Sequence, residues 1–437
     1  MLWGFVLFMP VGMNYLAACA MLAALACGGD WRQRAARLRA SPLAWPLAAF
    51  AVWIAAVGLL GPHHPETGLS LWHDLRIWLT LGMTALLSAE ESMAALKAFL
   101  LAALLALLAL ALARFAALPA SPALGPWQHV IAMKGNKSIN DALLFTLVGV
   151  TAAVLGLNRA GHGRRGRRAA AVGLAIALAS GLVAAVVLPS RTSLLGLVIA
   201  ILGACAHQWR GRARPLLAAF AVAAAAAGAL LWLAPSVQQK FDLGLQELQE
   251  ARAGAVSEGS WVVRFYMYRE TARMVAERPW AGWGLGAWTP EWQRRVPPLL
   301  ADYSMPHNDF LWLGSETGVP GLLILLWLLL GAARAAWRRR DLGGRMAFAA
   351  SLLLLVATSL NSALRDAAIG LSLPWIVFVY VQLGLVGSGR WRMPWMREWR
   401  PQGAEAAAKV PAGKISAFRQ STPLDFPRRP PRALDGS

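Results

Sequence analysis

The sequence predicts an all-α fold, a polytopic bundle of transmembrane helices. Hydrophobic residues make up 57% of the 437 residues and charged residues only 15%, whereas soluble domains carry about a quarter charged residues. The apolar residues come in blocks of about 20 rather than in a 3.6-residue stripe, which suits helices surrounded by lipid. Most charges flank these blocks, and the 21 tryptophans fit a membrane protein because indole rings favour the headgroup region.

Eleven blocks are long enough to cross a bilayer, which takes roughly 20 apolar residues per helix. They lie near residues 3–27, 43–60, 72–88, 94–118, 141–157, 169–188, 191–207, 215–235, 309–332, 346–364 and 371–387. An odd number of spans puts Met1 on the outer side of the membrane. Two explanations stay open: a further helix would precede the first block, or residues 1–27 would form a bent re-entrant pair.

The distribution of Lys and Arg among the connecting segments predicts which side of the membrane each segment faces. One alternate set of segments, including 31–39, 158–168, 333–345 and the tail from 388, holds 28 of the 42 Lys and Arg residues. Short segments rich in Lys and Arg stay in the cytoplasm. The tail is therefore expected inside, and the segment 236–308 outside. A net charge of +20 could suggest a protein that binds nucleic acid. That interpretation becomes less favoured because most of the charges flank apolar blocks.

Four regions follow from this topology. N-terminal transmembrane helices occupy residues 1–235, and the long outer segment occupies 236–308. C-terminal transmembrane helices occupy 309–387, and 388–437 reads as a basic, disordered tail because it has few large apolar residues. The three cysteines offer neither a disulfide framework nor metal-ligand spacing.

The long outer segment carries most of the chemically capable side chains. It opens with helix-like polar sequence, continues with an amphipathic helix that should end before Pro279, and turns at the Gly-Trp-Gly stretch 282–286. His307 follows, where the next span begins. A histidine there suits proton transfer near neutral pH, although a polar helix cap is an equally ordinary role.

Basic side chains on the same side suggest an anion. Arg191 stands at the outer start of a span, where a guanidinium can hold a phosphate bidentately or can simply anchor the helix to headgroups. Lys137 precedes another span, where it would add to an anion site or bind headgroups. A base, a cationic clamp and a membrane edge together suggest a reaction on a lipid-linked substrate.

Three motifs resemble the O-antigen ligase and polymerase superfamily of bacterial envelope enzymes. The first is Ser-Arg-Thr-Ser-Leu-Leu at 190–195, similar to the family's Arg-x-x-x-Leu pattern. The second is Arg-Phe-Tyr-Met-Tyr-Arg at 264–269, followed by Pro279 and the glycine-rich turn. The third is His-Asn-Asp-Phe-Leu at 307–311, with Glu316-Thr317-Gly318 after it. The likeness covers roughly residues 180–330.

The resemblance implies a GT-C-like glycosyltransferase of about twelve spans that needs no metal or other cofactor. The donor would be a glycan on undecaprenyl pyrophosphate, and a ligase would use the lipid A–core of lipopolysaccharide as acceptor. His307 would activate the acceptor hydroxyl, and Arg191 and Arg264 would bind the pyrophosphate. Asn308, Lys137 and Asp366 are supporting candidates; Asp366 matches an acidic residue that family members carry in a late outer loop. The protein would lie in the bacterial inner membrane with its site facing the periplasm.

Several functions remain open within this reading. A ligase is favoured over a polymerase because the chain has one long outer segment, and 119–140 is short. A protein O-oligosaccharyltransferase would carry a larger outer C-terminal region. A transporter of polyprenyl-linked sugars would place ionisable groups in mid-span, whereas these blocks are mostly Leu and Ala.

Overall fold

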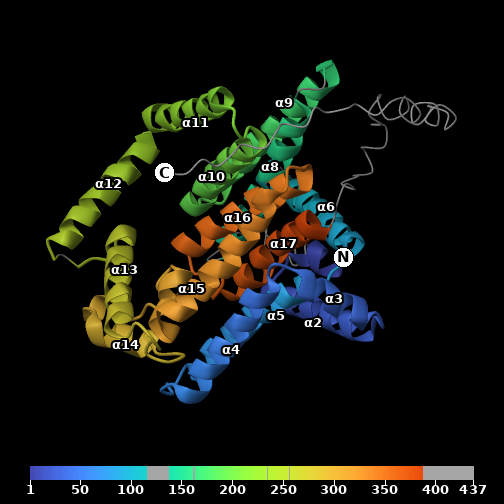
Figure 1. Cartoon of the computed structure of the whole chain (residues 1–437). Helices are drawn as coiled ribbons and strands as arrows, with labels where there is room; N and C mark the ends of the chain where they lie inside the picture. The colour runs from blue at the N-terminus through green and yellow to red at the C-terminus, as the bar shows by residue number, and fades with distance from the viewer. Residues whose placement is uncertain (116–136, 161–162, 234, 255, 387–437) are drawn as a thin grey trace, which may run out of the picture. The chain divides into compact units, whose positions relative to one another are not determined.

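The computed structural model describes residues 1–115, 137–160, 163–233, 235–254 and 256–386. Within these ranges the chain is helical and contains no strand (Figure 1). The all-α fold predicted from the sequence is confirmed. The predictions for the tail 388–437 and for most of 119–140 lie outside the described residues.

The helices differ in length, and some are long enough to cross a membrane while others are shorter. Their bounds are α1 (Leu2–Val6), α2 (Val11–Cys27), α3 (Trp31–Ala40), α4 (Ala44–Leu60), α5 (Thr67–Ala85), α6 (Ala89–Phe115), α8 (Lys137–Arg159), α9 (Gly163–Leu182), the π-helix η2 (Val183–Val187), α10 (Arg191–Gln208), α11 (Ala213–Leu233), α12 (Pro235–Arg252), α13 (Ser260–Glu277), α14 (Trp288–Arg295), the 3-10 helix η3 (Pro298–Leu300), α15 (Asp309–Arg338), α16 (Leu342–Leu360) and α17 (Ala367–Val386).

Seven helices of the described chain are long and apolar enough to cross a membrane, or eight if the bent pair α2 and α3 counts as one span. The sequence predicted eleven, and the difference has local causes. Residues 1–27 do not form one helix. The helix α1 ends at Val6, before Pro10, and α2 begins after this proline. The helix α4 has only 17 residues, and α5 carries His73, Asp74 and Arg76.

Packing identifies the core of the bundle. The helix α17 is buried along nearly its whole length and packs against α16, α5, α6 and α8. The helix α16 also packs against α10 and α15. By contrast, α9 exposes Val172, Leu174 and Leu178. Apolar side chains exposed on different sides of one helix suit contact with lipid tails, which supports a multi-pass membrane protein.

The helix α15 is interrupted one third of the way along. Gly318 has φ 75° and ψ −178°, so the helix breaks there and resumes at Pro320. The break leaves backbone groups without intrahelical partners, and other segments supply them. The Trp283 N–H donates to the Ser315 carbonyl over 2.9 Å, and the Gly284 N–H donates to the Glu316 carbonyl over 3.0 Å. The predicted glycine-rich turn is thereby fixed onto α15.

Buried charges gather beside this break. Glu316 is fully buried and accepts a hydrogen bond from the Ser70 hydroxyl of α5. Arg365 lies 3.9 Å from Glu316 and 3.5 Å from Glu66. Asp74 is fully buried in α5. Asp74 is the eighth residue of α5 and Glu316 is the eighth residue of α15.

We expect Gly318→Ala to destabilise the protein. A Cβ at this position would lie 2.5 Å from the Trp280 carbonyl oxygen, and the backbone is left-handed. A strained left-handed residue costs about 1–3 kcal/mol, and the clash adds to that. Thermal unfolding of purified protein in detergent measures the effect. The control is Gly82→Ala in α5, where an added Cβ meets nothing within 4 Å; equal melting temperatures for the two variants would contradict this account of the break.

Candidate functional site

A cavity of about 630 Å³ lies between α10 and α13. Arg191, Thr192 and Leu195 come from α10, and Leu360 comes from the end of α16. The wall formed by α13 contains Trp261, Arg264, Phe265, Tyr268 and Arg269, with Leu248 from α12. Positions 261, 264, 265 and 268 share one face of α13 because they are three or four residues apart.

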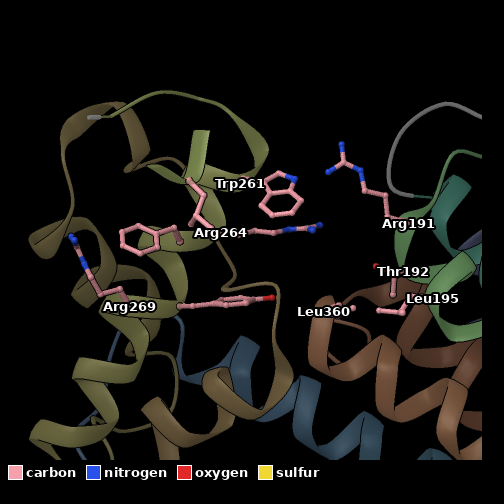
Figure 2. A pocket seen from close by; sticks show the side chains of 10 residues that line it. Arg191, Thr192, Leu195, Trp261, Arg264, Arg269 and Leu360 are labelled. Carbon is pink, nitrogen blue, oxygen red and sulfur yellow. The ribbon is translucent and has the colours of Figure 1, made fainter. Parts of the chain in front are cut away.

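Two arginines predicted as substrate-binding residues meet at this cavity. In Figure 2 the guanidinium groups of Arg191 and Arg264 reach into the same space from α10 and α13, with the Trp261 ring beside Arg264. Neither group has a carboxylate partner within the part of the chain that the structure describes. Arg191 is also the first residue of α10, so the positive end of the helix dipole adds to its charge. The arrangement is therefore electropositive and lacks an anion of its own.

Arg269 lines the same cavity but is arranged differently. Its Nε lies 2.7 Å from the Glu270 carboxylate, which Arg273 also contacts at 2.9 Å. Figure 2 shows its guanidinium group pointing away from Arg191 and Arg264. Arg269 therefore pairs with a carboxylate that it shares with Arg273, whereas Arg191 and Arg264 have no such partner among the described residues.

His307 lies next to this wall. Its backbone carbonyl accepts a hydrogen bond from the Tyr268 hydroxyl over 3.2 Å. Among the described residues other than glycine, His307 alone has a positive φ, at 53°, and this conformation turns the chain into α15. Burial lowers the pKa of His307 below its ordinary value of 6.5, and the positive charge of Arg264 lowers it further. The imidazole is therefore neutral at pH 7 and able to accept a proton.

The two residues after His307 hold it in place. The Asn308 side chain caps α15 by accepting from the Leu311 N–H over 3.0 Å, and its amide donates to the Ser359 carbonyl over 2.9 Å. The Asp309 carboxylate accepts the Leu364 N–H over 2.9 Å. The His-Asn-Asp motif thus places a histidine beside the cavity and binds its two neighbours to the end of α16 and to the segment that follows.

Asp366, another supporting candidate, does not line the cavity. Asp366 caps α17, where one carboxylate oxygen accepts from the N–H groups of Ala368 and Ile369 over 2.8 Å each. Lys137 is the first residue of α8, and its side chain lies outside the described part of the structure. Sequence reasoning missed Trp261, Phe265 and Leu360 as cavity residues; the spacing of Trp261 and Phe265 from Arg264 on α13 would have indicated the first two.

Comparison with known proteins gives one match. Residues 173–326 match a family model described as O-Antigen ligase. This part of the chain is therefore similar to the O-antigen ligase family. The match begins within α9 and ends within α15, so the matched segment contains Arg191, Arg264 and His307. No curated protein matches the chain.

The family match supports the predicted class of function, but it does not test the predicted donor or acceptor. The similarity of residues 173–326 supports a function of the O-antigen ligase or polymerase type, and it does not separate these two activities. The resemblance inferred from the three motifs is confirmed, since all three lie inside the matched residues. The roles of individual side chains are taken up as proposals below.

Proposed function

We propose that the protein transfers an O-antigen glycan from undecaprenyl pyrophosphate to the lipid A–core of lipopolysaccharide. One observation carries this proposal: two arginines without carboxylate partners line a cavity beside a neutral histidine. Paired guanidinium groups match the geometry and charge of a pyrophosphate. The apolar cavity wall of Trp261, Phe265 and Leu195 suits the isoprenoid chain of the donor.

The proposed reaction is a direct displacement at the anomeric carbon of the donor. The acceptor hydroxyl gives its proton to His307, and its oxygen forms the new bond to that carbon. The bond from this carbon to the pyrophosphate oxygen breaks, and undecaprenyl pyrophosphate leaves. Negative charge grows on the leaving group, where Arg191 and Arg264 stabilise it. One such displacement inverts the anomeric configuration and draws on no metal.

The ligase is preferred to a polymerase because the chain has a single long segment on the predicted outer side, while 119–140 is short. We place the protein in the bacterial inner membrane, with the site facing the periplasm and the C-terminus in the cytoplasm, because the short segments rich in Lys and Arg lie on the opposite side from 236–308.

Deletion of the gene in its host separates the candidate functions. In a ligase deletion, lipopolysaccharide on a gel should show core without O-antigen while lipid-linked polymer accumulates. A polymerase deletion should instead show core that carries a single repeat unit. Loss of a transporter of lipid-linked sugars would leave the lipid-linked units on the cytoplasmic side. Normal ladders in the deletion strain would overturn the proposed function.

The pH dependence of transfer should report the coupling between Arg264 and His307. A lowered histidine pKa keeps the base unprotonated down to a pH below 6.5, so kcat/KM of the wild type should fall only below that pH. Arg264→Ala removes the positive charge, raises the pKa of His307 and should move this acid limb to higher pH. Arg273→Ala, on the same helix and paired with Glu270, is the control. An acid limb at the same pH in Arg264→Ala and wild type would refute the coupling.

A further inference from the structure

A second, smaller cavity adjoins the first. Its volume is about 200 Å³, and it shares Arg191, Thr192 and Arg264 with the larger cavity. Its other lining residues are Ile139, Pro189, Ser190, Ser260 and Asn361. The shared arginines therefore lie at the boundary between two different spaces, a large one walled mainly by apolar side chains and a small one walled largely by polar side chains.

Asn361 is the side chain of this small cavity that most clearly lacks a partner. It is only 5% exposed, and its Nδ2 forms no hydrogen bond within the described chain. A buried amide donor normally has a partner, because burial without one costs free energy. The neighbouring polar groups are better satisfied: the Ser190 hydroxyl accepts from the Ser193 N–H over 3.2 Å. Asn361 therefore lines this cavity with an amide group whose Nδ2 is enclosed and has no hydrogen-bond partner among the described residues.

Asn361 lies close to the residues that follow His307. It is the C-cap residue of α16, directly after Leu360, which lines the larger cavity. The Asn308 amide donates to the Ser359 carbonyl in the same turn. The end of α16 therefore contributes to both cavities and is held by the residue that follows His307.

We propose that the small polar cavity binds the first sugar of the donor, and that the side-chain amide of Asn361 forms a hydrogen bond with that sugar. The inference rests on the proposed function. In such a donor the pyrophosphate joins the lipid to the first sugar. If the shared arginines bind the pyrophosphate, the isoprenoid chain extends into the apolar cavity, and the sugar must extend to the polar side. Asn361 then becomes a residue that determines donor specificity.

Binding measurements with two probes test this assignment. One probe is the lipid-linked glycan purified from host membranes, and the other is undecaprenyl pyrophosphate without any sugar. Asn361→Ala should weaken binding of the glycan probe about tenfold, as expected for one lost hydrogen bond to a buried group, and should leave binding of undecaprenyl pyrophosphate unchanged. Asn361→Leu keeps the approximate size of the side chain, removes its hydrogen-bonding groups and adds no charge beside Arg191 and Arg264, and it serves as the second variant if the alanine protein does not fold.

The control is Ser351→Ala on the same helix, whose hydroxyl already donates to the Ala347 carbonyl over 2.8 Å; it should bind both probes like the wild type. If both Asn361 variants lose affinity equally for the two probes, the amide contacts phosphate and the sugar assignment is wrong. Unchanged affinity for both probes would also overturn it. A separate result, full retention of undecaprenyl pyrophosphate binding by Arg191→Ala and Arg264→Ala, would instead overturn the proposed function itself.

Discussion

His307→Asn is expected to reduce glycan transfer about 10²- to 10⁴-fold, the range that general base catalysis commonly contributes. Asparagine tolerates the left-handed backbone that His307 adopts at φ 53°, yet it cannot accept a proton near neutral pH. The hydrogen bond from Tyr268 ends on the carbonyl of residue 307 and not on its ring. The variant should therefore keep the local fold while it loses the base.

His307→Ala should lose activity to a similar extent, but it adds strain because alanine disfavours a positive φ. The matched control is His63→Ala, an exposed histidine in the segment between α4 and α5, which should transfer glycan like the wild type. Initial rates with purified protein, together with melting temperatures, measure both effects. A His307→Asn enzyme with wild-type rates would remove His307 from the mechanism.

Arg191→Lys and Arg264→Lys should each lower kcat about 10²-fold or more, the range seen when one group that stabilises transition-state charge is removed. Lysine keeps the charge but lacks the planar fork that binds two phosphate oxygens at once. The double variant should lose less than the product of the two single losses, because both groups act on the same pyrophosphate and such residues are not additive.

Arg269→Lys is the control for this pair. Arg269 lines the same cavity from the same helix as Arg264, but its guanidinium group already pairs with Glu270. It should keep most of its activity. Steady-state kinetics against the lipid-linked donor distinguishes the three variants. A loss in Arg269→Lys as large as in Arg264→Lys would show that cavity shape, rather than free positive charge, determines the rate.

Local sequence patterns predicted much of the fold and part of the site. Pro279 marked the end of α13, which the structure ends at Glu277, and the glycines at 282, 284 and 286 all have positive φ as a tight turn requires. Arg191 and Arg264 lie 73 positions apart in the sequence, yet they line one cavity. The three family-like motifs allowed this pairing to be proposed, since spacing alone carries no information on distant contacts.

Other features depend on contacts that no local pattern encodes. The break in α15 at Gly318 is stabilised by Trp283 and Gly284, which donate to carbonyls of α15 from a different segment. Asn361 reads as an ordinary helix-terminal residue, and only packing beside Arg191 and Arg264 gives it a cavity to face. Asn308 and Asp366, predicted as supporting site residues, form helix caps, a role that their positions before α15 and α17 fit equally well.

The central claim is that the cavity between α10 and α13, with His307 beside it, transfers glycan from a lipid pyrophosphate. Transfer by the purified protein tests it most directly, with labelled glycan on undecaprenyl pyrophosphate as donor and lipid A–core as acceptor in detergent micelles. The wild type should form labelled lipopolysaccharide and release undecaprenyl pyrophosphate, while Arg191→Lys, Arg264→Lys and His307→Asn should form little of either. Undiminished transfer by these three folded variants would contradict the claim.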